Sequence, residues 1–188
     1  MIKMIVFLGN PGQEYKNTRH NAGWLCCDLI NEIQYEKWQK KFKGSWLSYG
    51  SGDKKVIFLK PETYMNKSGE SLIAAATFFK IKPEEILVVH DDLEQKYGHI
   101  SFRFGGGLAG HNGLKSISTH MGTKDFNRYR IGIGRPVHGS VSSWVTGRFS
   151  KEEEIHLHLI LERSAQMIMN CLGKEPKQIP QERIEVVN

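Results

Sequence analysis

Three short apolar runs occur in the first half of the chain, and each is followed at once by polar, glycine or proline residues. They cover residues 2–8, 56–59 and 86–89 and are rich in Ile, Val and Leu, as is typical of strands buried on both faces. Segments with helical periodicity separate the runs, which restricts the chain to folds in which strands and helices alternate.

The helical segments are read from the spacing of their apolar residues. This spacing predicts helices over residues 22–38, 71–79 and 111–121. A further helix is predicted from Ser150, because Ser150 and Glu153 form a capping-box pattern ahead of an apolar stripe that ends at Gly173.

We therefore expect an α/β fold: a single globular domain with a central mixed, largely parallel β-sheet flanked by helices on both faces. One hairpin is expected around residues 46–59. A length of 188 residues fits one domain, so residues 1–188 form a single predicted unit. Residues 173–188 contain Pro176 and Pro180 and are expected to form a loosely ordered tail.

Composition narrows the class of protein. A hydrophobic share of 39% and a charged share of 24% are those of a folded globule, which argues against disorder. The first eight residues are too short an apolar run for a membrane span and lack a cleavage site, so we expect a cytoplasmic protein without membrane association. The net charge of +6 favours contact with a polyanion.

Polar side chains follow three of the predicted strands. Asn10 comes after the first strand, His90, Asp91 and Asp92 come after the third, and a glycine-rich loop follows residues 99–104. Functional groups in such sheets collect beyond the carboxyl ends of the strands, so these groups are expected to meet at one edge. His20 opens the next helical segment and Asn66 begins another, which places both near this edge.

A cluster of one His, one Asp and several Asn suits attack by water on an ester. A neutral imidazole can deprotonate water while a carboxylate orients the ring, and amide groups can stabilise the oxyanion. The structural alternatives are a turn at Asn10, a helix cap at Asn66 and a tight backbone feature at Asn112. The combination favours the functional interpretation.

Other catalytic classes fit less well. Gly105, Gly107 and Gly110 spell the dinucleotide pattern, but Asp125 precedes the next strand where the pattern needs an acid at its end, so we interpret the glycines as a mobile or close-approach loop. A metal site could draw on His90, Asp91, Asp92 and His111, yet no spacing defines a coordination geometry, and we predict neither metal nor cofactor. The three cysteines lack the spacing of a zinc site or a disulfide framework.

Basic residues gather after the glycine loop, either as a solvated surface or as a surface for RNA phosphates. Tyr15 and Tyr64 offer rings on which an unpaired RNA end could stack. The basic group consists of Arg103, Lys115, Lys124, Arg128, Arg130, Arg135, Arg148 and Lys151.

Five motifs in one order closely resemble bacterial peptidyl-tRNA hydrolase over residues 1 to about 172. They are GNPGQEYKNTRHNAG at 9–23, PETYMNKSG at 61–69, HDDLE at 90–94, FGGGLAGHNGLKS at 104–116 and RYRIGIGRP at 128–136. The resemblance implies a monomeric, metal-independent hydrolase whose substrate is peptidyl-tRNA released prematurely from ribosomes.

The resemblance also implies a role for each matched residue. It makes His20 the catalytic base, Asp91 the acid that orients it, and Asn10 a residue that helps distinguish peptidyl-tRNA from unblocked aminoacyl-tRNA. The positions that would contact the tRNA end or the peptide are Tyr15, Tyr64, Asn66 and Asn112, and those that would contact tRNA phosphates are Arg103 and Arg130.

The chain departs from the family pattern without losing the proposed base, acid or amides. The departures are Phe7 for Gly, Leu108 for a polar residue, Arg135 for His, and Glu94 and Lys96 for Asp and Pro. The rival hypothesis is a noncatalytic RNA-binding module, because some plant-organelle relatives act in intron splicing. That module would bind RNA without cleaving an ester.

Overall fold

The computed structural model describes residues 1–187 and contains one mixed sheet of eight strands in the order β2-β3-β4-β1-β5-β7-β6-β8. The strands are β1 (Met4–Phe7), β2 (Gln39–Lys41), β3 (Gly44–Tyr49), β4 (Val56–Pro61), β5 (Ile86–Asp92), β6 (His99–Phe104), β7 (Asn127–Gly132) and β8 (Ile184–Glu185). The helices are α1 (Ala22–Cys27), α2 (Ser68–Phe79), α3 (Asn112–Met121), α4 (Val141–Val145) and α5 (Lys151–Asn170).

The centre of the sheet is parallel and its margins are antiparallel. β4, β1, β5 and β7 run in one direction, whereas β3 and β6 pair antiparallel with β4 and β7. The carboxyl ends of β1 and β5 therefore reach the same edge, as predicted, although β5 runs on through His90, Asp91 and Asp92, which were expected after its end.

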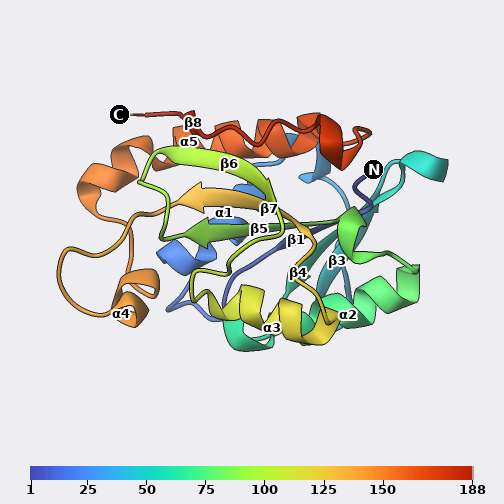
Figure 1. Ribbon diagram of the computed structural model, residues 1–188, viewed down its shortest axis with the longest axis horizontal. Helices are drawn as coiled ribbons and strands as arrows, with labels where there is room; N and C mark the ends of the chain where they lie inside the picture. Colours follow the sequence, from blue (N-terminus) through green and yellow to red (C-terminus); the bar gives the residue numbers. More distant parts are fainter. Residues whose placement is uncertain (188) are drawn as a thin grey trace.

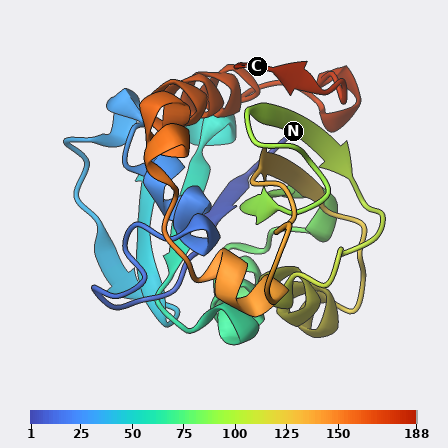
Figure 2. The same cartoon turned by 90° about the vertical axis from the view of Figure 1, so that its left-hand side faces the viewer.

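Helices cover both faces of the sheet (Figures 1 and 2), which confirms the predicted α/β architecture. Along β1, Ile5 and Phe7 pack in the cluster that includes residues of α1 and α5, while Met4 and Val6 pack in the cluster that includes residues of α2 and α3. This alternation follows from the opposite directions of successive side chains in a strand and explains why the strand is apolar throughout.

The predicted helix over residues 22–38 is wrong in its length. α1 ends at Cys27, and the chain then turns through a short 3-10 helix, Asn31–Ile33, before it forms the edge strand β2. Ile30 and Ile33 are buried in the core, so the apolar spacing was real, but successive turns rather than one helix place them there.

The C-terminal segment is more ordered than predicted. Instead of a loose tail, its β8 pairs antiparallel with β6, and Val186 and Val187 pack against the core. The other predicted elements match within a few residues, whereas β2 and α4 were not predicted. The helix predicted from Ser150 begins with the expected capping box. Among the described residues, no helix combines the length and apolar character needed to cross a bilayer.

Candidate active site

His20 lies in a buried 3-10 turn, Arg19–Asn21, that leads directly into α1. The helix lies very close to the sheet, because a Cβ atom at Gly23 would be 2.6 Å from the Leu8 carbonyl oxygen and 2.7 Å from the Val89 carbonyl oxygen. Only glycine permits this approach to the ends of β1 and β5. The turn before the helix thereby reaches Asp91 near the end of β5.

Arg19, the first residue of this turn, connects it to later parts of the chain. Its guanidinium donates to Glu153 at 2.6 Å and to the Arg148 carbonyl at 2.7 Å, and it lies 3.5 Å from the centroid of the Trp144 ring. Glu153 is also the capping-box acid of α5. The turn with His20 is thus fastened to two helices that lie far along the chain.

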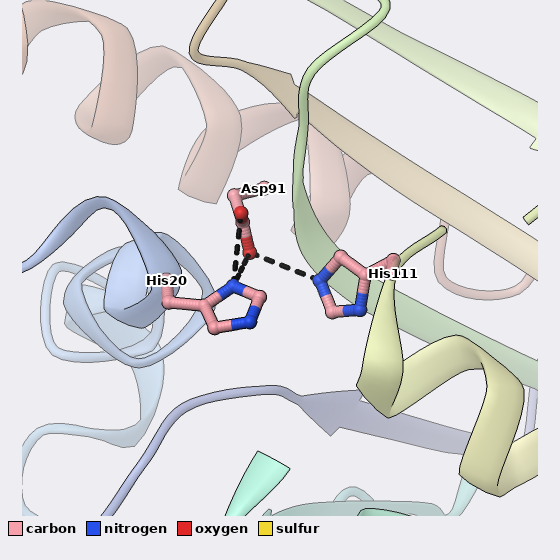
Figure 3. A group of neighbouring side chains, drawn as sticks. All are labelled: His20, Asp91 and His111. Carbon is pink, nitrogen blue, oxygen red and sulfur yellow. Dashed lines mark hydrogen bonds and ion pairs between the residues drawn. The ribbon is translucent and has the colours of Figure 1, made fainter. Parts of the chain in front are cut away.

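The predicted pair of His20 and Asp91 is formed (Figure 3). His20 Nδ1 lies 2.9 Å from Asp91 Oδ1 and 3.0 Å from Oδ2, and both residues are buried. An ionised carboxylate accepts hydrogen bonds only, so Nδ1 carries a proton, and in the neutral ring Nε2 keeps a lone pair. This is the tautomer that a general base needs.

Burial and charge act in opposite directions on the pair. Burial would lower the pKa of His20, but the charge of Asp91 and the hydrogen bond to it prevail and raise that pKa above its ordinary value. Burial would raise the pKa of Asp91, yet the imidazoles of His20 and His111 and their hydrogen bonds hold it well below its usual range. The carboxylate is therefore ionised at neutral pH.

His111 is a neighbour of Asp91 that sequence reasoning did not place in the catalytic set. Its Nε2 lies 3.0 Å from Asp91 Oδ1, and its ring centroid lies 4.8 Å from that of His20 (Figure 3). Its Nδ1 accepts from the backbone N–H groups of Gly113 and Leu114, so His111 is the N-cap of α3. The available signal was its position at the start of a predicted helix, which by itself indicates only a cap.

The metal interpretation can be tested on this geometry. One atom from each of His20, Asp91 and His111 lies within 4.8 Å of the others, which is close enough for a cation. However, His111 Nδ1 accepts two amide protons, so the ring proton must lie on Nε2, the atom that faces the cluster. A metal ligand needs a lone pair at that atom. The hydrogen bonds therefore do not fit a metal bound by these three residues.

His90 was also part of the metal hypothesis, and its side chain bonds to the backbone. Its Nδ1 lies 2.6 Å from the Asp91 carbonyl oxygen, which can only accept, so Nδ1 carries the proton. Burial, with a contribution from His111, lowers the pKa of His90 to about 3. His90 is therefore uncharged at neutral pH.

Asn10 is oriented by two backbone contacts. Its Oδ1 accepts from the Met65 N–H at 2.7 Å, which directs its amino group away from that contact. Asn21 holds the Asn10 backbone through a pair of hydrogen bonds, accepting from its N–H at 2.9 Å and donating to its carbonyl at 3.1 Å. The sequence analysis assigned no role to Asn21.

The residues discussed surround one cavity of about 360 Å³. His20, Asn10 and Asn66 line it, as predicted for groups at this edge of the sheet, and Asn112 and Tyr64 line it as well. Its apolar lining is provided by Met65, Leu93, Leu108, Val141 and Val145. Tyr15 lies outside this lining but packs edge-on against the exposed Tyr64, with 6.4 Å between ring centroids.

The predicted basic positions differ in exposure. Arg103 is exposed, whereas Arg130 is partly buried and donates from Nε to Asp92 at 2.7 Å. Arg128 is buried between them, with Nε and Nη2 lacking a partner among the described residues. Burial and the charges of Arg103 and Arg130 lower the pKa of Arg128 to about 10. The cluster thus carries more positive charge than Asp92 neutralises.

Two departures from the family pattern contact each other. Arg135 donates from Nε to Glu94 Oε1 at 3.1 Å, and both side chains are exposed. Phe7 is buried and stacks on Phe58, with 6.0 Å between centroids. Leu108 belongs to the apolar lining of the cavity. These substitutions leave the contacts of His20 and Asp91 intact.

The chain is similar to known proteins over nearly its whole length. Residues 4–186 match the sequence pattern of the peptidyl-tRNA hydrolase family. The peptidyl-tRNA hydrolase of Lactobacillus johnsonii is 43% identical over 182 residues, covering 95% of this chain and 97% of its own length. That of Neisseria meningitidis serogroup C is 46% identical over 179 residues, covering 92% of this chain and 91% of its own length. The crystal structure of peptidyl-tRNA hydrolase from Acinetobacter baumannii aligns with a TM-score of 0.83 at 37% identity, covering 95% of this chain and 92% of the other.

Proposed function

The chain belongs to the peptidyl-tRNA hydrolase family, and on that premise we propose that it hydrolyses the ester between a peptide and the 3′-terminal ribose of tRNA, with His20 as the base. Its substrates are peptidyl-tRNAs released prematurely from ribosomes, and the reaction returns free tRNA. The observation that carries the proposal is the buried His20 and Asp91 pair at the wall of a cavity that is also lined by three Asn residues.

The reaction follows from the protonation states. His20 Nε2 takes a proton from a water molecule, whose oxygen attacks the ester carbonyl carbon, while Asp91 stabilises the imidazolium that forms. Collapse of the tetrahedral intermediate breaks the bond between the carbonyl carbon and the ribose oxygen. Nε2 then returns its proton to that oxygen, so the products are the free peptide acid and tRNA.

The asparagines are suited to the charge that develops at the carbonyl. Met65 fixes the Asn10 side chain through Oδ1, which leaves the Asn10 amino group to donate into the cavity. We assign to Asn10 a contact with the blocked α-amino group of the substrate, which separates peptidyl-tRNA from unblocked aminoacyl-tRNA. Asn66 and Asn112 line the same cavity and are assigned to the ester and the peptide.

The RNA part of the substrate is assigned to the surface around the cavity mouth. Tyr64 is 57% exposed and packs on Tyr15, so these rings can stack on the unpaired tRNA end. Arg103 and Arg130 are assigned to phosphates, with Arg103 the more exposed. We further propose that the protein acts as a monomer in the cytoplasm, without a metal or cofactor.

Substitution of the base tests the proposal. His20→Ala is expected to lower single-turnover release of tRNA from an N-blocked aminoacyl-tRNA by about 100- to 10,000-fold, because proton abstraction is lost. tRNA affinity should remain close to that of the unsubstituted protein. His156→Ala, an exposed position on α5, serves as the control and should be fully active.

Full single-turnover activity in the His20 variant would contradict the assigned base. RNA binding without any ester cleavage by the unsubstituted protein would favour the noncatalytic module instead. The intact His20 and Asp91 pair gives that alternative no support.

A further inference from the structure

Asp91 has one carboxylate but two imidazole partners. Oδ1 is 2.9 Å from His20 Nδ1 and 3.0 Å from His111 Nε2, so the same oxygen serves both rings (Figure 3). We propose that His111 is a positioning residue that donates Nε2–H to Asp91 and limits how strongly this carboxylate draws a proton onto His20. The inference rests on the proposed function, since it concerns the residue assigned as its base.

The hydrogen bonds of His111 define which ring nitrogen carries its proton. Nδ1 lies 3.1 Å from the Gly113 nitrogen and 3.3 Å from the Leu114 nitrogen, and both backbone groups are donors. A proton on Nδ1 would face these two N–H groups, and the first turn of α3 would lose its cap. The ring proton therefore lies on Nε2, where it can only donate to Asp91.

The preferred N-cap residues would perform only one of the two roles of His111 at this position. Asn, Asp, Ser and Thr are the preferred N-caps, and their side chains are too short to extend from the helix start to Asp91. An imidazole caps the helix with one nitrogen and donates with the other. The start of α3 is thereby coupled to the carboxylate of β5, and the side chain of His111 is only 8% exposed in this position.

Several other titratable groups lie around the pair of His20 and Asp91. Besides His20 and His111, titratable or charged residues lie on the turn before α1, on α1, on β5 and on β7. They are Arg19 on the turn, Cys26 and Cys27 on α1, His90 and Asp92 on β5, and Arg128 and Arg130 on β7. Arg19 is paired with Glu153 and Arg130 with Asp92. Burial lowers the pKa of His90 to about 3 and raises the pKa of Cys27 to about 12, so neither is charged at neutral pH. The Nε2–H of His111 is thus the second hydrogen bond, beside that of His20, that stabilises the Asp91 carboxylate.

Removal of the His111 donor should shift the pKa of His20 in one direction only. A carboxylate that keeps only the His20 hydrogen bond interacts more strongly with the His20 imidazolium, which raises the pKa of His20 further. More of the base is then protonated below neutral pH. The acid limb of the dependence of kcat/KM on pH should therefore move upward, while the plateau at high pH remains.

His111→Asn separates the two roles, because Asn is a strong N-cap that cannot reach Asp91. We expect the acid limb to move upward by about half a pH unit, which lowers kcat/KM on the limb about threefold, with the plateau within about twofold of the unsubstituted enzyme. His111→Ala should show the same movement together with a lower melting temperature, since it also loses the cap. His120→Asn, on the last turn of α3 and exposed, is the control and should leave the limb in place.

An unmoved acid limb in His111→Asn would overturn the inference, whether or not the plateau falls, because a purely structural role predicts a uniform loss at all pH values. A second measurement does not depend on activity. Nitrogen NMR of the histidine rings should show His111 with Nδ1 unprotonated and Nε2 protonated, and a protonated Nδ1 would also overturn the inference.

The same set of experiments distinguishes failure of the two proposals. If the unsubstituted protein releases no tRNA from N-blocked aminoacyl-tRNA, the proposed function fails, whatever the NMR spectrum shows. If it releases tRNA and His20→Ala does not, but His111→Asn has an unchanged limb, then only the role of His111 fails.

Discussion

Asp91 determines the chemistry of the site at the scale of single residues. It lies near the end of a strand whose seven residues are all buried, where an unpaired carboxylate would be strongly disfavoured. Hydrogen bonds from His20 and His111 compensate for this burial. As a result, Nε2 of the neutral His20 ring keeps a lone pair at the cavity. Asp91 stabilises the protonated form of the same ring.

The pH dependence of the reaction tests this assignment. Because Asp91 raises the pKa of His20 against the effect of burial, activity should fall as the pH drops through that raised pKa and the base becomes protonated. In Asp91→Asn burial acts alone, so the acid limb of kcat/KM should move to lower pH. The plateau should fall by at least about 100-fold, since the ring is no longer held in the active tautomer.

This shift is opposite in sign to that expected for His111→Asn, and the two variants are best measured together. An acid limb that stays in place in Asp91→Asn would show that the limb reports a group other than His20.

The contact between α1 and the sheet matters most at the scale of the elements. The six residues of α1 are too few to form a stable helix alone, so packing must define its position. Gly23 lets the helix lie directly on the carbonyl groups of Leu8 and Val89. The turn that carries His20 precedes this contact by two residues, and the geometry of the His20 and Asp91 pair therefore depends on a residue without a side chain.

Gly23→Ala should destabilise the protein although Ala is the better helix former. The propensity gain is about 1 kcal/mol, whereas a Cβ atom 2.6 Å from a backbone oxygen forces α1 away from the strands at a cost of about 1–3 kcal/mol or more. We expect a net loss in the free energy of unfolding together with reduced kcat, measured by denaturant titration and single-turnover kinetics.

Gly107→Ala is the matched control, because a Cβ atom there meets nothing within 4 Å. Its free energy of unfolding should stay within about 0.5 kcal/mol of the unsubstituted protein. A Gly23 variant as stable as this control would contradict the packing argument.

The distribution of charge and cavities matters at the scale of the whole molecule. The parallel strands end at one edge of the sheet, where the cavity opens beside the rings of Tyr15 and Tyr64. Arg103, Arg128 and Arg130 come from the antiparallel pair β6 and β7 in the same sheet. Arg130 lies next to the cavity through its ion pair with the lining residue Asp92, and Arg128 and Arg103 extend the positive charge along β7 and β6, as expected for a surface that binds a polyanion.

Arg103→Ala should weaken tRNA binding and reduce the salt dependence of the binding constant by somewhat under one log unit per log unit of salt, by loss of one phosphate contact. The effect should be the same for tRNAs of different sequence. The measurement is a titration of tRNA binding at several salt concentrations.

Lys55→Ala provides the control at the amino end of β4, on the opposite edge of the sheet from the cavity. It should leave the salt dependence unchanged. Equal slopes for the Arg103 variant and the unsubstituted protein would exclude a phosphate contact at Arg103.

Local patterns in the sequence were sufficient for the strands other than β2 and β8, most of the helices, the capping box at Ser150 and the proximity of His20 to Asp91. Each of these depends on residue spacing, on a cap motif or on the rule that strand ends meet at one edge. The early end of α1 could not be read this way, because Ile30 and Ile33 keep helical spacing although they lie in turns.

The donation from His111 to Asp91, the anchoring of Arg19 to Glu153 and the close contact of Gly23 with the sheet depended on the folded chain. Each joins residues that are distant in sequence or brings a backbone within contact distance of another element. Such contacts have no periodic signature, since they arise only when separate elements pack together. The sequence therefore predicted His20 and Asp91 as base and acid, whereas packing determined that His111 also bonds to Asp91.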